Sequence, residues 1–154
     1  MFQIAIDPGK MCGVASLFTY NSILSVEELT PYETVRWVEM RLAQWMNDIS
    51  EVDVVAERYT MTNQHHTQQP EALEVIGALR YVTQKHHVNF TLQSRSVKAK
   101  VTNEMLRELD WWNPTPGGHA NDATRHLIVR MLTLNPRSDV AMRPSYGKMD
   151  SIKK

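Results

Sequence analysis

The stretch IAIDPGK, residues 4–10, decides the fold of this chain. Its alternating apolar residues predict a strand, and the strand meets the Pro8-Gly9 turn directly after Asp7. A carboxylate in this position lies on the rim of a sheet, fixed by the strand behind it, which suits a metal ligand. Residues 13–17 then begin a second apolar stretch, so the unit is predicted to be strand, tight turn, strand.

The residues that follow predict the rest of a meander and then a helix. A third short strand is expected at residues 22–26, after a turn at Tyr20-Asn21, which gives three antiparallel strands. The segment 30–33, TPYE, combines an N-cap residue, a proline in the first turn and a capping-box glutamate. Apolar residues then recur at spacings of three and four, as in an amphipathic helix: Val35, Val38, Leu42, Trp45 and Ile49.

A second acid ends a second predicted buried strand. Residues 52–57, VDVVAE, form an apolar run after a helix, which is typical of a parallel strand, and the run finishes on Glu57. Polar residues 60–70 predict a loop. A helix is expected from Pro70, with Gly77 allowing another element to approach closely, followed by a strand at residues 88–93.

The last predicted helix carries a third acid. A short helix is expected at about residues 103–109, and the last helix begins in HANDATRHLIVRML, where His119 and Asp122 share one face of the first turn. His126, one turn further on, is interpreted as a packed or exposed helix residue. From residue 135 the composition becomes polar and basic, so we expect one domain at residues 1–134 and a loosely held tail at 135–154.

Composition limits the classes of protein that the chain can represent. Its 154 residues fit one domain with a self-sufficient core, and the single Cys12 excludes an internal disulfide and suggests a small buried residue. No apolar stretch approaches the roughly 20 residues of a membrane span and no signal segment is present, so a cytoplasmic protein without a membrane partner is expected.

Charge is balanced overall but uneven along the chain. Seventeen basic and seventeen acidic side chains leave no net attraction for polyanions, so nucleic acid would need a local basic surface. Residues 80–100 carry five basic side chains and no acid, which makes them the candidate for that surface. An ordinary solvated surface is the alternative interpretation.

Asp7, Glu57 and Asp122 lie on separate predicted elements that one sheet rim could bring together. Clustered carboxylates repel one another unless a cation neutralises them. Oxygen ligands suit Mg²⁺ or Mn²⁺, and two such ions can activate a water and stabilise the leaving oxygen in phosphodiester hydrolysis. Taken alone, each acid is better explained as an ordinary strand-end or helix-start residue.

Three motifs together resemble the RuvC family of Holliday-junction resolvases: DPG after the first strand, AE at the end of the fourth and HANDA at the last helix. The resemblance implies an α/β ribonuclease H-like fold, with a mixed five-stranded sheet flanked by helices. It also implies a homodimer that nicks four-way junctions with two divalent ions, Mg²⁺ or Mn²⁺. Asp7, Glu57, His119 and Asp122 would be the metal-site and catalytic residues. A histidine at 119 would favour Mn²⁺, or would position the water.

The resemblance extends less closely to the basic region. Lys98 and Lys100 resemble basic residues that precede the last helix in the family, where they would either assist catalysis at the scissile phosphate or attract the backbone. Together with Arg95 they would bind DNA. The glycine-rich stretch usual at this point is missing, which resembles phage or divergent bacterial members; a phage protein would act in the host bacterial cytoplasm.

Aromatic residues give further candidates for DNA contact. Tyr59 would either stack on a DNA base or pack in the core. Trp111 and Trp112 are interpreted as core residues, with DNA contact as the alternative.

Rival functions remain open at this level. On the same fold, a nuclease could cut RNA in hybrids, or forks or flaps. A nucleotide-binding protein of the actin-like kind would need a second phosphate loop, and a non-catalytic DNA-binding module would be expected to lack one of the three acids.

Overall fold

The computed structural model describes residues 1–18, 23–45, 51–61 and 69–135, and its elements follow the predicted order. The strands are β1 (Phe2–Asp7), β2 (Cys12–Phe18), β3 (Ile23–Leu29), β4 (Val52–Glu57) and β5 (Asn89–Gln93). The helices are α1 (Pro31–Trp45), α2 (Pro70–Lys85), the 3₁₀ helix η2 (Arg95–Lys100), α3 (Asn103–Glu108) and α4 (His119–Leu134). The predicted turn at Tyr20-Asn21, the end of the first helix at Ile49, most of the 60–70 loop and the tail from residue 136 lie outside the described residues.

The five strands form one mixed sheet in the order β3-β2-β1-β4-β5. β1, β2 and β3 pair antiparallel, as predicted, while β4 and β5 run parallel to β1. The carboxyl ends of the three parallel strands therefore meet at one edge of the sheet. Asp7 and Glu57 end two of these strands, and Gln93 ends the third, in register with Glu57.

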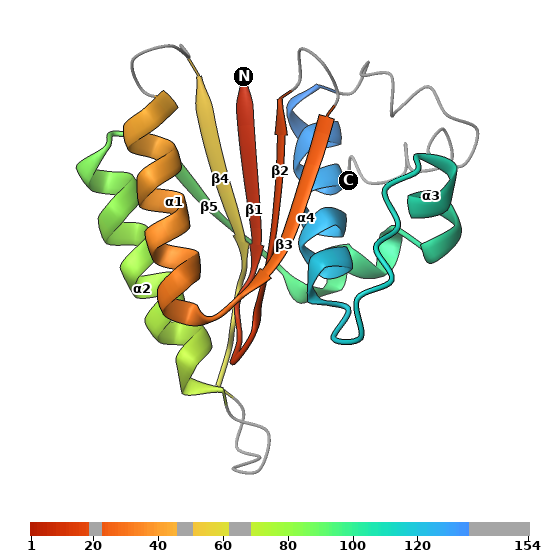
Figure 1. The fold of residues 1–154 in the computed structure, drawn as a ribbon, viewed down its shortest axis with the longest axis horizontal. Helices are drawn as coiled ribbons and strands as arrows, with labels where there is room; N and C mark the ends of the chain where they lie inside the picture. The colour runs from red at the N-terminus through yellow and green to blue at the C-terminus, as the bar shows by residue number, and fades with distance from the viewer. Residues whose placement is uncertain (19–22, 46–50, 62–68, 136–154) are drawn as a thin grey trace.

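Helices cover both faces of the sheet, with α1 and α2 side by side on one face and α4 on the other (Figure 1). Because side chains alternate along a strand, Phe2, Ile4 and Ile6 enter the core beneath α1 and α2. Ala5 packs instead in the core beneath α4. Asp7 lies two residues after Ala5 and so points to the same face of the sheet. The strand therefore presents its carboxylate to α4.

The start of α1 confirms the predicted capping box. Thr30 Oγ1 accepts the Glu33 backbone N–H at 3.4 Å, and Glu33 Oε2 accepts the Thr30 backbone N–H at 3.0 Å. The helix then buries Val38 and Leu42 from the predicted apolar row. Local sequence is thus sufficient to fix this boundary.

Two expectations from composition concern cysteine and membranes. Cys12 is fully buried in the core beneath α1 and α2, and its Sγ–H donates to the Gly9 carbonyl at 3.4 Å, so the prediction of a small buried residue is confirmed. Within the described ranges, no helix is long and apolar enough to cross a membrane.

Candidate active site

Asp7 and Glu57 are brought together by the pairing of β1 with β4. Ile6 is in register with Ala56, so the next residue of each strand lies at the same sheet edge. Both side chains point to the face covered by α4, because each lies two residues after a residue that packs beneath α4, Ala5 on β1 and Val55 on β4. They are only 6% and 9% exposed. The fold therefore holds two acids side by side in a poorly hydrated position.

The first turn of α4 delivers His119 and Asp122 to the same edge. This turn lies against β2 at Gly13, where any side chain would collide with it. Gly118, at a φ of 71°, offers no side-chain cap, and Glu28 of β3 supplies the cap instead. Glu28 Oε1 accepts the Ala120 backbone N–H at 3.2 Å and the Thr115 hydroxyl at 2.7 Å. An acid from the far strand of the meander thus fixes where α4 begins.

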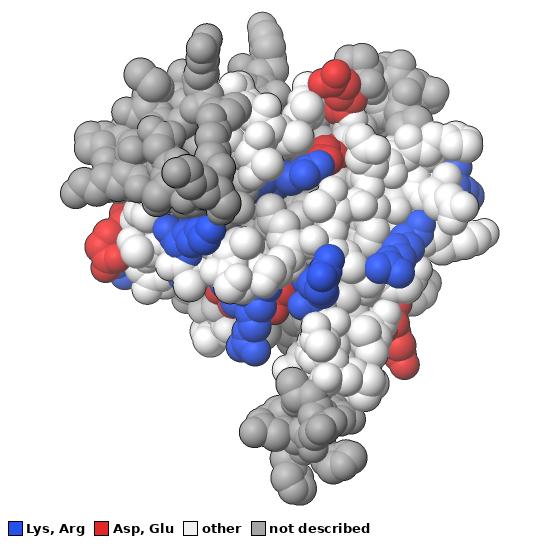
Figure 2. Space-filling model, turned by 180° about the vertical axis from the view of Figure 1, so that it is seen from behind, with Lys and Arg blue, Asp and Glu red and all other residues white. Residues whose placement is uncertain are grey.

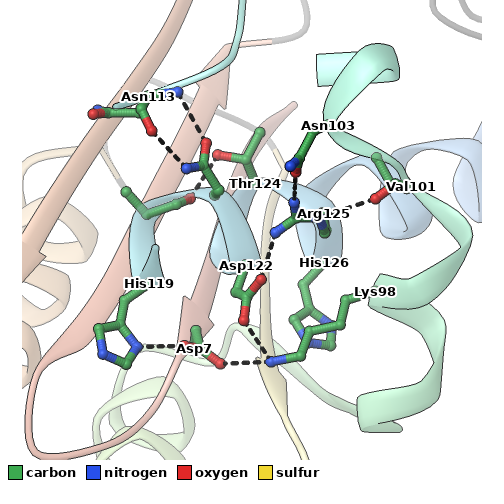
Figure 3. Close-up of polar contacts among 12 residues, drawn as sticks. Asp7, Lys98, Val101, Asn103, Asn113, His119, Asp122, Thr124, Arg125 and His126 are labelled. Atoms are coloured by element: carbon green, nitrogen blue, oxygen red, sulfur yellow. Dashed lines mark hydrogen bonds and ion pairs between the residues drawn. The ribbon is translucent and has the colours of Figure 1, made fainter. Parts of the chain in front are cut away.

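Lys98 lies between Asp7 and Asp122 (Figure 3), and its ammonium also contacts Glu57. Its Nζ donates to Asp122 Oδ2 at 2.7 Å and forms an ion pair with Glu57 Oε2 at 2.8 Å. The Oδ1 atom of Asp7 lies 3.5 Å from the same nitrogen. The ammonium therefore marks a position that three carboxylates prepare for a cation.

Burial disfavours the charged form of each group in the site, whereas the contacts between Lys98 and the acids favour it. Burial raises the pKa of Asp7 above its ordinary value, and the opposing effects of Lys98 and His119 do not overcome it. Burial also raises the pKa of Glu57, but hydrogen bonds from His126 and Lys98 outweigh it and leave that pKa lowered. Burial lowers the pKa of Lys98, yet its bonds to Asp122 and Glu57 raise it overall, so the lysine stays charged.

Each acid also has a second partner of its own. His119 Nδ1 donates to Asp7 Oδ2 at 2.9 Å, and Arg125 donates to Asp122 Oδ1 at 2.5 Å. Arg125 is held in turn by the Val101 carbonyl at 2.9 Å and by the side chain of Asn103. The partner of Glu57 is His126, whose Nε2 lies 3.0 Å from Oε2. His126 is therefore a packed residue, as predicted, but it packs against a site acid.

The types of side chain at this site suit a divalent metal ion. Three carboxylates and an imidazole are ligands that Mg²⁺ or Mn²⁺ accepts, and they already surround a positive charge. Within the part of the chain that the structure describes, however, no group of three or more His, Cys, Asp or Glu side chains lies close enough together to hold a metal. The acids are spaced around Lys98 Nζ, so metal binding requires that ammonium to move out.

A groove of about 560 Å³ opens beside the acids, between η2, α3 and α4. Its lining includes Arg95, Lys98, Thr102, Asn103, Asp122 and Arg125. The side chain of Arg95 is 80% exposed, with Nε 4.0 Å from Glu57 Oε1. Lys100, at the end of η2, is exposed and makes no described contact with the three acids. Of the two candidate lysines, the fold brings only Lys98 into the site.

The basic segment at residues 80–100 is divided between two faces of the sheet. Its first part belongs to α2, where Lys85 forms an ion pair with Glu39 of α1 at 2.7 Å. Its second part, η2, contacts α4 on the opposite face. The single basic sector expected from sequence is thus reduced to the η2 residues near the groove. Figure 2 shows a face on which Lys and Arg side chains cover more surface than Asp and Glu do.

The aromatic candidates make no described contact with the three acids. Tyr59 is half-buried outside both core clusters, and its hydroxyl accepts the Gln69 backbone N–H at 2.6 Å, just before α2. It therefore braces α2 and does not fill the core. Trp111 and Trp112 are partly buried and pack against the core beneath α4, as the core interpretation predicts.

The comparisons with known proteins agree with this architecture. No family sequence model matches the chain, and no curated protein matches it by sequence. Among solved structures, RuvC of Thermus thermophilus in complex with a Holliday junction substrate has a TM-score of 0.62 at 16% identity, covering 90% of this chain and 97% of that one. A second T. thermophilus RuvC structure gives 0.58 at 16% identity, covering 87% and 96%.

A viral protein gives the same result. The fowlpox virus Holliday junction resolvase has a TM-score of 0.54 at 11% identity, covering 86% of this chain and 99% of that one. The chain therefore has the ribonuclease H-like fold, with a mixed five-stranded sheet flanked by helices like that of these structures.

Proposed function

We propose that this protein is a metal-dependent endonuclease that cuts branched DNA, with four-way junctions as its substrate. The observation that carries this proposal is the convergence of Asp7, Glu57 and Asp122 on one cation position at the edge of the sheet. The RuvC-like fold supports it, since two of the similar structures are a RuvC bound to a Holliday junction and a viral Holliday junction resolvase.

The residues divide into three tasks. The three acids and His119 would hold the divalent ions, which when bound supply an activated water and stabilise the leaving oxygen of the phosphodiester. Lys98, released from the acids, would place its charge on the scissile phosphate. Arg125 holds Asp122 in place through a 2.5 Å bond. Burial of Asp7 and Glu57 keeps these interactions strong, because charges interact more strongly where water is excluded.

The proposal is tested with labelled four-way junction, fork, flap and RNA/DNA hybrid substrates in Mg²⁺, Mn²⁺ or chelator. Asp7→Asn keeps the shape of the side chain and removes its charge, so cleavage should fall at least about 10²-fold while junction binding survives. Cleavage of the junction in chelator, or full activity of Asp7→Asn, would contradict the metal site. Preference for hybrids, forks or flaps would assign the same site to a different substrate.

The groove beside the acids is the proposed path of the DNA strand. Arg95, Lys98 and Lys100 lie along η2, on the side of the sheet that carries the acids. Arg95→Ala and Lys100→Ala each remove one positive charge from this path, so each should flatten the plot of log affinity against log salt by about 0.9. Lys85→Ala is the matched control, because Lys85 lies on α2 and pairs with Glu39. Unchanged slopes for all three variants would place the DNA-binding surface elsewhere.

A homodimer through α2 is the proposed assembly. Leu73 and Tyr81 are 39% and 69% exposed, and Gly77 lies between them at helical spacing of four. A Cβ on Gly77 would meet no described atom within 4 Å, so the glycine is not needed for packing on its own sheet. A two-fold dimer would give two active sites, which match the two nicks that resolve a four-way junction.

Sedimentation tests the assembly directly. The protein should sediment as a dimer, Gly77→Gln should weaken the dimer, and a cruciform plasmid should be linearised by paired nicks in one binding event. A monomer that leaves mainly nicked circles would reject the dimer and would favour a flap or fork nuclease.

A further inference from the structure

His126 is a fully buried histidine that core packing alone does not explain. It lies on α4 one turn after Asp122, with no exposed surface, and both ring nitrogens have polar partners. Nε2 is 3.0 Å from Glu57 Oε2, and Nδ1 is 2.7 Å from Gln93 Oε1. An apolar side chain would fill the same space without these two bonds.

The chemistry of the partners fixes the role of each nitrogen. An ionised carboxylate only accepts hydrogen bonds, so Nε2 must carry the proton shared with Glu57. The amide of Gln93 offers both an acceptor and donors, so it can hold Nδ1 in either protonation state. The ring orientation is therefore maintained whatever the charge of the imidazole.

Backbone contacts fix Gln93 beside Glu57. The two residues are in register across β4 and β5, and the Gln93 carbonyl accepts the Arg58 backbone N–H at 2.6 Å. The chain of contacts from Gln93 through His126 to Glu57 thus joins β5, α4 and β4. The three elements meet at the edge where the acids converge.

We propose that His126 is a positioning residue, which holds the Glu57 carboxylate in the orientation that binds the catalytic cation, and that Gln93 fixes the imidazole. This inference rests on the proposed nuclease function. Glu57 has the longest side chain of the three acids and therefore the most rotamers to restrict. The same Oε2 atom contacts Lys98 Nζ at 2.8 Å, so the atom that His126 holds is the atom that faces the cation position.

A pair of variants separates this role from packing. His126→Leu replaces the imidazole with an apolar side chain of similar size and so removes the N–H. His126→Gln, by contrast, retains an N–H that can reach Glu57. Thr124→Val is the control: Thr124 is equally buried on α4, and its hydroxyl donates to the Ala120 carbonyl at 2.8 Å without touching an acid. Gln93→Leu removes the support of the ring and leaves His126 in place.

The readouts are Mn²⁺ affinity of the DNA-free protein, measured by calorimetry, and kcat and KM for a four-way junction. Loss of an outer partner of a metal ligand typically costs 10–100-fold in metal affinity or activity, so His126→Leu should lose about this much in Mn²⁺ affinity and kcat, with KM unchanged. His126→Gln should recover most of the loss, and Gln93→Leu should show a smaller one. Thr124→Val should bind Mn²⁺ like the wild type even where its melting temperature falls.

The outcomes distinguish this inference from the function on which it rests. Wild-type Mn²⁺ affinity and kcat in His126→Leu, in a protein that does cut junctions, would overturn the positioning role alone. Equal losses in His126→Leu, His126→Gln and Thr124→Val would assign His126 to packing. Where His126→Leu fails to fold, wild-type Mn²⁺ affinity in Gln93→Leu would overturn the inference. A wild-type protein that neither binds Mn²⁺ nor cuts branched DNA would reject the proposed function itself.

Discussion

Gly13 of β2 lies directly against His119 of α4: a Cβ built on the glycine would be 1.8 Å from the His119 carbonyl oxygen and 2.9 Å from the Ala120 nitrogen. Both obstructing atoms belong to the backbone, so no side-chain rotation relieves the collision. The absence of a side chain on Gly13 therefore sets how closely the helix that carries Asp122 approaches β2, where Gly13 is paired with Asp7 of β1.

Gly13→Ala should displace the start of α4. Inserting a methyl group into a packed contact costs about 1–3 kcal/mol, and a collision with backbone should reach the upper part of that range. Cleavage should fall as well, because Asp122 moves with the helix. Gly118→Ala is the control: it strains a positive φ at the same helix start, without a collision, at a cost of about 1–2 kcal/mol. Denaturant unfolding of both variants measures the costs, and equal stability of Gly13→Ala and the wild type would contradict the packing argument.

The cap that Glu28 gives to α4 should make stability depend on pH. Burial raises the pKa of Glu28, but bonds from Thr115 and the Ala120 backbone N–H outweigh it and leave the pKa below its ordinary value of 4.5. A lowered pKa in the folded state means that the stabilisation is complete above the unfolded pKa and is lost as pH falls through the folded one. Glu28→Gln, which removes only the charge, should therefore cost about 0.3–1 kcal/mol near pH 7 and progressively less as pH falls below 4.5.

Thermal melting of the wild type and Glu28→Gln between pH 3 and 7 checks this dependence. Glu74→Gln, on an exposed part of α2, is the control and should track the wild type at every pH. A constant difference between wild type and Glu28→Gln across the range would show that the charge of Glu28 plays no part.

The strands, the helices and the strand-end positions of two acids were predictable because they depend on local pattern. Asp7 and Glu57 each follow an apolar run, and parallel strands leave both at one sheet edge once β1 and β4 pair. The capping box at Thr30 similarly fixed the start of α1. Each of these signals is contained within a few neighbouring residues.

The partners of the acids were not predictable, because their contacts span distant parts of the chain. His119, Asp122 and His126 recur at spacings of three and four, so helical periodicity does place them on one face of α4. Sequence does not show that this face meets Glu57, 69 residues earlier. Lys98 lies in a short 3₁₀ helix without apolar periodicity, so nothing in its own segment distinguishes it from Lys100.

His119 should determine which metal ion supports cleavage. Its Nδ1 lies 2.9 Å from Asp7 Oδ2, which places the imidazole at the rim of the acid cluster. Mn²⁺ accepts imidazole more readily than Mg²⁺ does, so we expect Mn²⁺ to support cleavage at least as well. His119→Asp should move the ratio of Mg²⁺ to Mn²⁺ activity toward Mg²⁺ by about tenfold or more, within the range of effects seen around metal ligands. The neutral variant His119→Gln is the control, and a ratio unchanged in His119→Asp would show that the imidazole is not a ligand.

Lys98 should compete with the metal for the position between the acids. Lys98→Met removes the ammonium that neutralises three carboxylates, so the metal-free variant should be less stable than the wild type by roughly 3 kcal/mol, a typical cost of breaking a buried ion pair. Mg²⁺ then binds without displacing a charge, and added Mg²⁺ should raise the melting temperature more in the variant than in the wild type. Each kcal/mol of extra stabilisation corresponds to about 2–4 °C in a protein of this size.

Cleavage by Lys98→Met should nevertheless fall at least about 10²-fold, because the phosphate loses its positive partner. Lys100→Met, at an exposed position outside the cluster, should leave the Mg²⁺ response unchanged, and an equal response in Lys98→Met and wild type would show that ammonium and metal do not share one position.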